Sequence, residues 1–275
     1  MAGAPSPPDE VRTIGTAARR EAAALAAHAR ALDSAGWDSP TWCVGWSVRE
    51  VVAHLAEGMD RFGQQVRGAL AGQPVEFSMA ERDARRAQVK ALPDDALVAR
   101  LEDNTAAFFA PVESLAADVL LRPVVPMVAG LTPVFGVAQL RLFELAVHRW
   151  DVRVPTDPTA TVDAEAVALL MDWVLAGAHR QAKRDLLAGH QGIVRCETTG
   201  PTGGPVTITA SGAGVQVARG AAGAADATLH LSGEALLRWL WGRLPLATAL
   251  EQGSVRLEGQ RDAALAVSRA FGNPE

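Results

Sequence analysis

The hydrophobic pattern of this chain changes across one short segment, residues 154–162. The segment is polar and is broken twice by proline, at Pro155 and Pro158, as expected of a linker. Before it, apolar residues recur with the period of an α-helix, and after it several stretches alternate like β-strands. With 275 residues, the chain is long enough for two domains. We therefore predict a two-domain protein, all-α over residues 1–153 and α+β over residues 163–275.

The first domain contains four segments with helical character. The second segment begins at Ser47, because Ser47-Val-Arg-Glu50 has the spacing of a capping box that satisfies free backbone N–H groups at a helix start. In the fourth, Thr132 is predicted to cap a helix whose first residue is Pro133. Four consecutive helices favour an antiparallel four-helix bundle. The predicted helices cover residues 10–33, 47 to the break at Gly72, 94–117, and 133–151.

The second domain mixes helices with short strands that are bounded by Gly, Ser or Asp. Such a mixture is typical of an α+β domain. The predicted strands cover residues 192–198, 206–210, 215–218, 227–231 and 255–257. The predicted helices cover residues 163–183, 233–244 and 262–271.

Composition excludes several classes of partner. The 26 basic and 31 acidic residues give a net charge of -5 and are interspersed, which argues against nucleic-acid binding. There is no long uninterrupted apolar run, and the N-terminal residues lack the features of a signal peptide, so we expect a cytoplasmic protein that does not bind membranes. Cys43 and Cys196 are the only cysteines, and both are predicted to be reduced. The expected state is a monomer or a homodimer.

Three side chains form a candidate metal site. Glu144 and His148 are four residues apart, one helical turn, and His54 lies in another predicted helix at the edge of its apolar stripe. Two histidines and one carboxylate are the ligand set of catalytic zinc sites, in which the fourth position is open to water or substrate. We therefore expect chemistry at that position.

The same residues have a simpler interpretation. Glu144 and His148 could be an ordinary pair on a solvated helix face, and His54 a boundary histidine bonded to Glu50 or Glu57. Periodicity does not separate these alternatives.

Other reactive side chains are interpreted as structural. Cys43 lies between Trp42 and Trp46, a pattern that favours packing ahead of the capping box. The remaining histidines lack a carboxylate at ligand spacing and are predicted to be structural or on the surface. They are His28, His179, His190 and His230.

Two segments of the first domain carry a family resemblance. The stretches Trp42-Cys-Val-Gly-Trp-Ser-Val-Arg-Glu-Val-Val-Ala-His-Leu55 and Glu144-Leu-Ala-Val-His-Arg-Trp-Asp151 resemble the mycothiol-dependent maleylpyruvate isomerase family, which belongs to the DinB-like metalloenzymes. The resemblance implies that His54, Glu144 and His148 bind Zn²⁺ or another divalent metal. It also implies mycothiol as a cosubstrate.

The resemblance continues into the second domain. Residues 226–243 and 253–259 look like the family's C-terminal domain, which is similar to sterol carrier proteins. In the family an arginine of this domain acts at the active site, and the resemblance assigns that role to Arg243. Without the resemblance, Arg243 is a surface arginine at the end of a helix.

The implied partners are a small-molecule thiol and an electrophilic substrate. In the implied isomerisation a thiolate adds to the double bond of a cis enoic acid, the resulting single bond rotates, and the thiol leaves to give the trans isomer. Arg243 would hold the carboxylate and stabilise the enolate. The predicted pocket, a cleft between the two domains, is lined by Trp42, Trp46, Trp150 and residues 120–134.

Other functions stay open at this stage. Related DinB-like proteins transfer or exchange the thiol, so a mycothiol S-transferase acting in detoxification or natural-product biosynthesis is one alternative. A non-catalytic carrier of apolar ligands is another. A regulator that uses the metal only for stability would need a closed site, for which Asp151 is the one available fourth ligand. We expect Asp151 instead to orient a ligating histidine through a hydrogen bond, without binding the metal itself.

Overall fold

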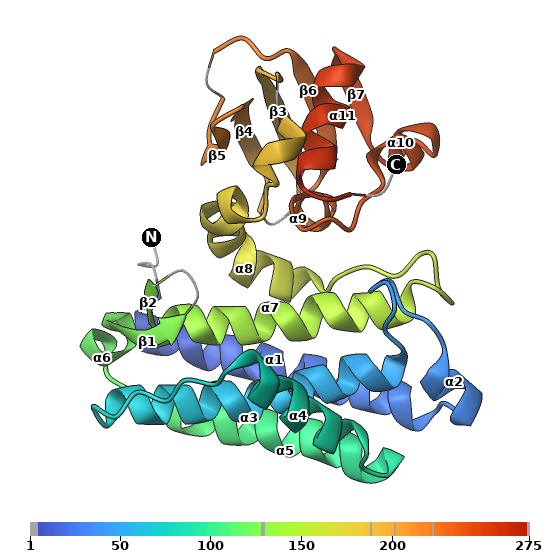
Figure 1. Ribbon diagram of the computed structural model, residues 1–275. Coiled ribbons are helices and arrows are strands. Elements are labelled where there is room, and N and C mark those ends of the chain that lie inside the picture. The colour runs from blue at the N-terminus through green and yellow to red at the C-terminus, as the bar shows by residue number, and fades with distance from the viewer. Residues whose placement is uncertain (1–4, 128–129, 188, 201, 222, 274–275) are drawn as a thin grey trace. The chain divides into compact units, whose positions relative to one another are not determined.

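The structure, a computed structural model, comprises two compact units, Met1–Ala166 and Val167–Glu275, each considered by itself (Figure 1). Residues 154–163, which include the predicted linker, have no regular secondary structure and lie in the first unit. The structure describes residues 5–127, 130–187, 189–200, 202–221 and 223–273.

The first unit is helical apart from one small hairpin, and the last helix, α8, spans the division between the units. Its helices are α1 (Pro7–Arg30), α2 (Ser34–Asp38), α3 (Val48–Leu70), α4 (Met79–Lys90), α5 (Asp94–Val112), α6 (Ala117–Leu121), α7 (Val134–Arg153) and α8 (Ala164–Gly177). The hairpin pairs β1 (Pro123–Met127) with β2 (Gly130–Pro133) in antiparallel fashion.

Helices α1, α3, α5 and α7 form the predicted bundle (Figure 1). Their connections are not all short, and as a result two neighbouring pairs run parallel. Arg49 in the first turn of α3 pairs with Asp94, the first residue of α5, and Arg149 of α7 meets Glu21 at a similar depth along α1. The long connection at residues 71–93, which contains α4, returns the chain to the starting end of α3, so that α5 runs parallel to α3. Residues 113–133 then join α5 to α7 at one end of the bundle, so that α7 runs antiparallel to α5 and parallel to α1 (Figure 1). Helices α3 and α7 run antiparallel, which matters for the site below (Figure 1).

The capping box at the start of α3 is confirmed. Ser47 Oγ accepts a hydrogen bond from the Glu50 backbone, and Glu50 Oε2 accepts one from the Ser47 backbone at 2.8 Å. The cap fixes where α3 begins and therefore which of its residues face the bundle core. A second capping box, Ser78 with Glu81, starts α4, a helix that the sequence analysis did not predict. No residue of α4 is buried, so it has no apolar stripe to reveal it.

Two predicted boundaries in this unit are wrong. The predicted Thr132 cap is not formed, because Thr132 pairs with Val125 in the hairpin and α7 starts at Val134 without a side-chain cap. The helix predicted to reach residue 117 ends at Val112, just after Pro111, and the chain turns before α6. Proline close to the end of α5 is consistent with this early stop.

The second unit is an α+β domain built on one five-stranded sheet, as predicted. The strand order is β5-β4-β3-β6-β7, in which β3 and β6 are parallel and the other neighbours are antiparallel. Helices α9 and α11 pack against β3 and β6. The strands are β3 (Gly192–Thr199), β4 (Gly204–Ser211), β5 (Gly214–Arg219), β6 (Ala227–Ser232) and β7 (Arg256–Gly259). The helices are α9 (Gly233–Leu240), α10 (Leu246–Glu251) and α11 (Arg261–Ala270), with short 3₁₀ turns at Ala178–Arg180 and Arg184–Leu187.

The predicted helix over residues 163–183 stops at Gly177 and continues as a 3₁₀ turn, and the helix predicted over 233–244 stops at Leu240. Among the described residues, every helix is too short or too polar to cross a membrane.

An ion pair buried in the bundle joins α1 to α7. Glu21 is fully buried, and both of its oxygens accept hydrogen bonds from Arg149 Nη1 at 3.0 and 3.1 Å. Burial raises the pKa of Glu21, while the Arg149 guanidinium opposes that shift. We expect Glu21→Ala to destabilise the protein by about 2–3 kcal/mol, less than for a fully buried pair because Arg149 keeps 23% of its side chain exposed. Urea unfolding followed by circular dichroism measures the loss.

The matched control is Glu102→Ala, which removes the partner of Arg30 at the surface. That pair is exposed, so the change should stay within about 0.5 kcal/mol. Equal effects of the two substitutions would contradict the importance of the buried pair.

Candidate metal centre

Helices α3 and α7 bring the three predicted ligands together. His54 lies on the second turn of α3, and Glu144 and His148 lie one turn apart on α7. His54 Nε2 is 3.0 Å from Glu144 Oε2, and His148 Nε2 is 3.5 Å from the same oxygen. His54 is therefore bonded to Glu144, and the alternative partners on its own helix, Glu50 and Glu57, bind Lys90 and arginines instead.

The geometry of these three side chains fits a divalent metal. One ligand atom from each of the three residues lies within 4.8 Å of the other two. With metal–ligand bonds of about 2.0–2.2 Å, two ligands of a tetrahedral zinc ion are roughly 3.3 Å apart, close to the separations from Glu144 Oε2. The side chains of His54 and Glu144 remain 23% and 22% exposed, which leaves the group accessible from outside. The donor set, two imidazoles and one carboxylate, suits zinc.

The polar face of α7 is not solvated, and that alternative is wrong. Arg141 is 2% exposed and Asp151 is fully buried. Asp151 Oδ2 lies 2.8 Å from His148 Nδ1, so it fixes the orientation of the ring and leaves Nε2 directed at Glu144. This is the position expected of a group that orients a ligand.

Cys43 is closer to the centre than its sequence context indicated. Its Sγ donates to Asp151 Oδ2 at 3.3 Å and lies 3.7 Å from His148 Nδ1. The loop is also tied to α7 through its backbone, because the Trp42 N–H donates to the Asp151 carbonyl at 2.9 Å. Cys43, His148 and Asp151 form a second group with metal-ligating atoms, which shares His148 with the first. No spacing rule could reveal a contact between residues 43 and 148.

The tryptophans near the centre have different roles. The Trp46 ring lies 5.0 Å from the His54 ring and 6.2 Å from the His148 ring, measured between centroids, and it covers both imidazoles. Trp150, which was predicted to line a pocket, is 2% exposed and donates its indole N–H to the carbonyl of Ala160. The pocket prediction is therefore wrong for Trp150. An aromatic residue next to a site motif can equally well belong to the hydrophobic core.

The charges around the centre shift the pKa values of its members. Burial opposes ionisation of Glu144, but hydrogen bonds from His148 and His54 outweigh it and hold the pKa well below 4.5. Burial also opposes protonation of His148, yet its hydrogen bonds to Asp151, Cys43 and Glu144 raise its pKa well above 6.5. Burial lowers the pKa of His54, which favours the neutral form that binds metals.

Arg141 lies beside Glu144 as a buried cation. Its Nη2 is 3.7 Å from Glu144 Oε2, and burial lowers its pKa to about 10. Its Nε and Nη1 have no hydrogen-bond partner within the described part of the chain. Gly58 of α3 makes room for it, because a Cβ at that position would lie 2.6 Å from Arg141 Nη1. Arg141 precedes Glu144 by three residues on α7, so the two side chains lie on one face of the helix.

Three further residues from the sequence analysis belong to the second unit. Arg243 follows α9 in the second unit, half-buried, and its Nη1 donates to the carbonyl of Trp241 at 2.9 Å. Its role at an active site stays a prediction. His230 of β6 lies 3.2 Å from Glu258 of the adjacent strand β7, a pairing that the spacing in the sequence does not reveal. His179 bonds a backbone carbonyl.

Each of the two units matches a known domain family. Residues 18–153 match the mycothiol maleylpyruvate isomerase N-terminal domain, and residues 174–272 match the SCP-2 sterol transfer family. The chain therefore combines a mycothiol maleylpyruvate isomerase N-terminal domain with an SCP-2 domain, and the resemblance seen in the sequence is confirmed for both domains.

Solved structures agree at the level of the fold. A crystal structure of a mutant of the mycothiol-dependent maleylpyruvate isomerase aligns with a TM-score of 0.63 and 16% identity, covering 90% of this chain and 92% of that one. A second crystal structure of that isomerase gives a TM-score of 0.59 and 17% identity, with 85% and 90% covered. No curated protein sequence matches the chain.

Proposed function

We propose that this protein is a cytoplasmic metalloenzyme that uses mycothiol to attack a small electrophilic substrate. His54, Glu144 and His148 would hold one divalent metal, with zinc preferred. The observation that carries the proposal is the convergence of these three ligand atoms from two helices, within 4.8 Å of one another and partly exposed. Three protein ligands leave one position open, as in catalytic rather than structural zinc sites.

When bound, the metal lowers the pKa of a thiol at the open position, so that the thiol is deprotonated near neutral pH. The chain's own residues prepare this site. Asp151 accepts from His148 Nδ1 and so keeps Nε2 directed at the centre. The Trp46 ring covers the two imidazoles and limits their access to water.

The reaction class within the family has two candidates, cis-trans isomerisation and transfer or exchange of the thiol. We favour addition to an unsaturated acid, with Arg243 binding the carboxylate that is conjugated to the reacting double bond. Arg243→Gln should then lower kcat for such an acid and leave the metal content unchanged. The match of the second unit to the SCP-2 sterol transfer family supports a different candidate, a carrier of apolar ligands.

One experiment separates these candidates. The purified protein is analysed for metal, with about one divalent ion per chain expected, and is incubated with mycothiol and either maleyl acids or simple electrophiles. Mass spectrometry of an isomer without net thiol consumption identifies an isomerase, and a thioether product identifies a transferase. If neither product forms and fatty ligands copurify, the carrier function replaces the enzymatic one.

A further inference from the structure

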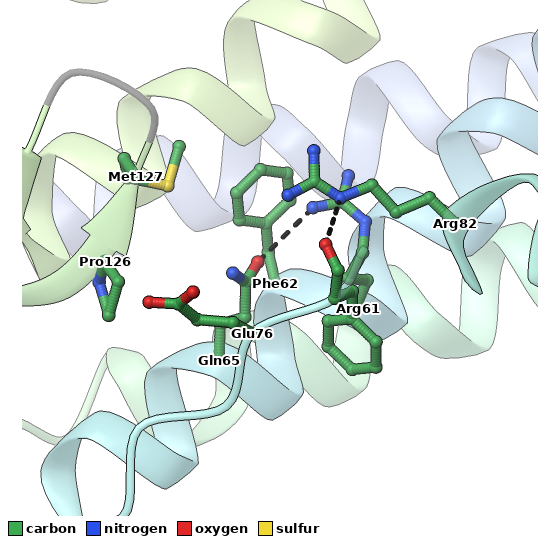
Figure 2. Close-up of a pocket in the computed structure, with 8 residues that line it drawn as sticks. Arg61, Phe62, Gln65, Glu76, Arg82, Pro126 and Met127 are labelled. Carbon is green, nitrogen blue, oxygen red and sulfur yellow. Dashed lines mark hydrogen bonds between the residues drawn. The ribbon is translucent and has the colours of Figure 1, made fainter. Parts of the chain in front are cut away.

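The first unit contains a pocket of about 300 Å³ that none of the proposed roles uses (Figure 2). It lies between α3, the segment leading into α4, the start of α4, and β1. Its lining consists of Arg61, Phe62, Gln65, Glu76, Phe77, Arg82, Pro126 and Met127.

The pocket lies on the same side of α3 as the candidate metal centre. Arg61 follows His54 by seven residues, two helical turns, so the two share a helix face about 10 Å apart along the axis. A chain of contacts joins the two places. The Arg141 guanidinium lies 4.3 Å from the centre of the Phe62 ring and 3.7 Å from Glu144 Oε2. The candidate metal centre and the pocket therefore lie about two helical turns apart on one face of α3, with the packed side chains of Arg141 and Phe62 between them.

Arg61 in the pocket and Arg141 beside it each have a carboxylate neighbour. Arg61 bonds Glu57 and Gln65 within α3, and its guanidinium lies 4.2 Å from the Phe62 ring centre. Arg141 has Glu144 as its neighbour. Burial lowers the pKa of Arg61, an effect that Glu57 opposes and that repulsion from Arg82 increases.

Arg82 is the cation of the pocket that lacks a counter-ion. Its Nε donates to the carbonyl of Phe77 at 3.0 Å, and within the described ranges of the chain no carboxylate lies within ion-pair distance of it. Figure 2 shows its guanidinium beside that of Arg61, on the wall opposite Glu76 and Pro126. Its Nη1 contacts Met79 Sδ at 4.0 Å, and thioether sulfur is a weak acceptor, so this half-buried guanidinium is well suited to bind a carboxylate.

The rest of the lining indicates the remainder of the ligand. Phe62, Phe77, Pro126 and Met127 offer an apolar surface next to Arg82. Glu76 is exposed, where solvent screens its charge, and would weakly repel an anion rather than hold it. Together these features fit a molecule with an apolar body and a single acidic group at this end.

We propose that this pocket binds an acidic group of the electrophilic substrate, remote from the reacting carbon, with Arg82 contacting its carboxylate. The proposal rests on the proposed function and specifies its substrate class: an elongated, partly apolar acid that spans about two turns of α3. Arg82 would act through substrate affinity, and thus through KM, whereas the predicted effect of Arg243 is on kcat.

Direct binding tests the proposal without turnover. The metal-loaded protein is titrated by calorimetry with 3-phenylpropionate and with the neutral 3-phenylpropanamide. Arg82→Gln should weaken binding of the acid about 10- to 100-fold, the loss expected for one charge-assisted hydrogen bond, and leave the amide unaffected. Arg82→Lys should retain most of the affinity, and Glu76→Gln should bind the acid as tightly as the wild type or more tightly. The control is Arg67→Gln, an exposed arginine of α3 outside this pocket, which should have no effect.

Several results would overturn the proposal. If the wild type does not bind the acid, or if Arg82→Gln binds it normally, the acid group is held elsewhere, for instance on the metal. If Arg82→Gln also loses the amide, the residue only maintains the pocket. If a neutral polyol such as inositol binds in place of the acid, and both Arg82→Gln and Glu76→Gln weaken it, the pocket recognises a hydroxylated ligand. Acid binding that depends on Arg82, in a protein that shows no thiol chemistry, would reject the proposed function and leave the pocket assignment standing.

Discussion

Replacing His54, Glu144 or His148 is expected to abolish metal binding and activity together. Each alanine variant should fall from about one divalent metal per chain to a trace, because two remaining ligands do not hold a catalytic zinc ion. The metal supplies several kcal/mol of catalysis, so kcat/KM should fall by about 1,000-fold or more. Elemental analysis and a mycothiol-dependent assay provide the two measurements. The control is His179→Ala, since His179 is exposed and bonds a backbone carbonyl.

Two candidate ligand groups share His148, so only some variants can tell which group binds the metal. Loss of metal in His148→Ala does not distinguish them, because both groups contain His148. His54→Ala and Cys43→Ser do distinguish them. We expect His54→Ala to lose the metal and Cys43→Ser to keep it. The opposite result would move the metal to the group formed by Cys43, His148 and Asp151, and equal metal in all variants would remove the ligand assignment altogether.

Acidification offers an independent check of the same site. The raised pKa of His148 means that at neutral pH, in the absence of metal, its imidazole carries a proton on both nitrogens and is positively charged. Metal binding must displace that proton, so metal affinity should rise with pH across the neutral range. A pH-independent affinity would argue that His148 is not a ligand.

Local patterns were enough to predict the elements that fix the site. The Ser47 cap and the helical spacing of Glu144 and His148 follow from contacts within one or two turns of a helix, which sequence records directly. The strand alternation that predicted the sheet is equally local. The order of the strands and the parallel helix pairs depend on where long connections place the chain, and no short pattern encodes this.

Contacts between distant residues were not predictable. Cys43 and Asp151 are 108 residues apart, and Arg82 reaches the pocket from a helix whose polar sequence has no stripe. The hairpin was not predicted, because Pro123 and Pro126 disfavour a strand in the absence of a partner. Packing decided each of these cases, and packing is a property of the whole fold.

The second large effect is expected at Asp151, although it is not an assigned ligand. Asp151 is fully buried and accepts hydrogen bonds from His148 Nδ1 and Cys43 Sγ. Asp151→Ala removes the group that fixes the tautomer of His148, so metal affinity should fall about 10- to 100-fold. Such a loss is typical when the hydrogen-bond partner of a ligating histidine is removed. Competition with a chelator measures the affinity.

A structural explanation for such a loss has to be separated from an orienting one. Asp151→Ala also leaves buried donors unpaired and should cost about 1–3 kcal/mol of stability, measured by urea unfolding. Asn has the same shape as Asp and keeps one acceptor oxygen, so Asp151→Asn should recover most of the stability. It should recover metal affinity only if its amide oxygen, rather than its NH₂ group, faces His148 Nδ1. If Asp151→Ala binds metal as tightly as the wild type while its stability falls, Asp151 supports the fold alone. A loss of affinity in both variants, with near-normal stability in Asp151→Asn, assigns it to the orientation of His148.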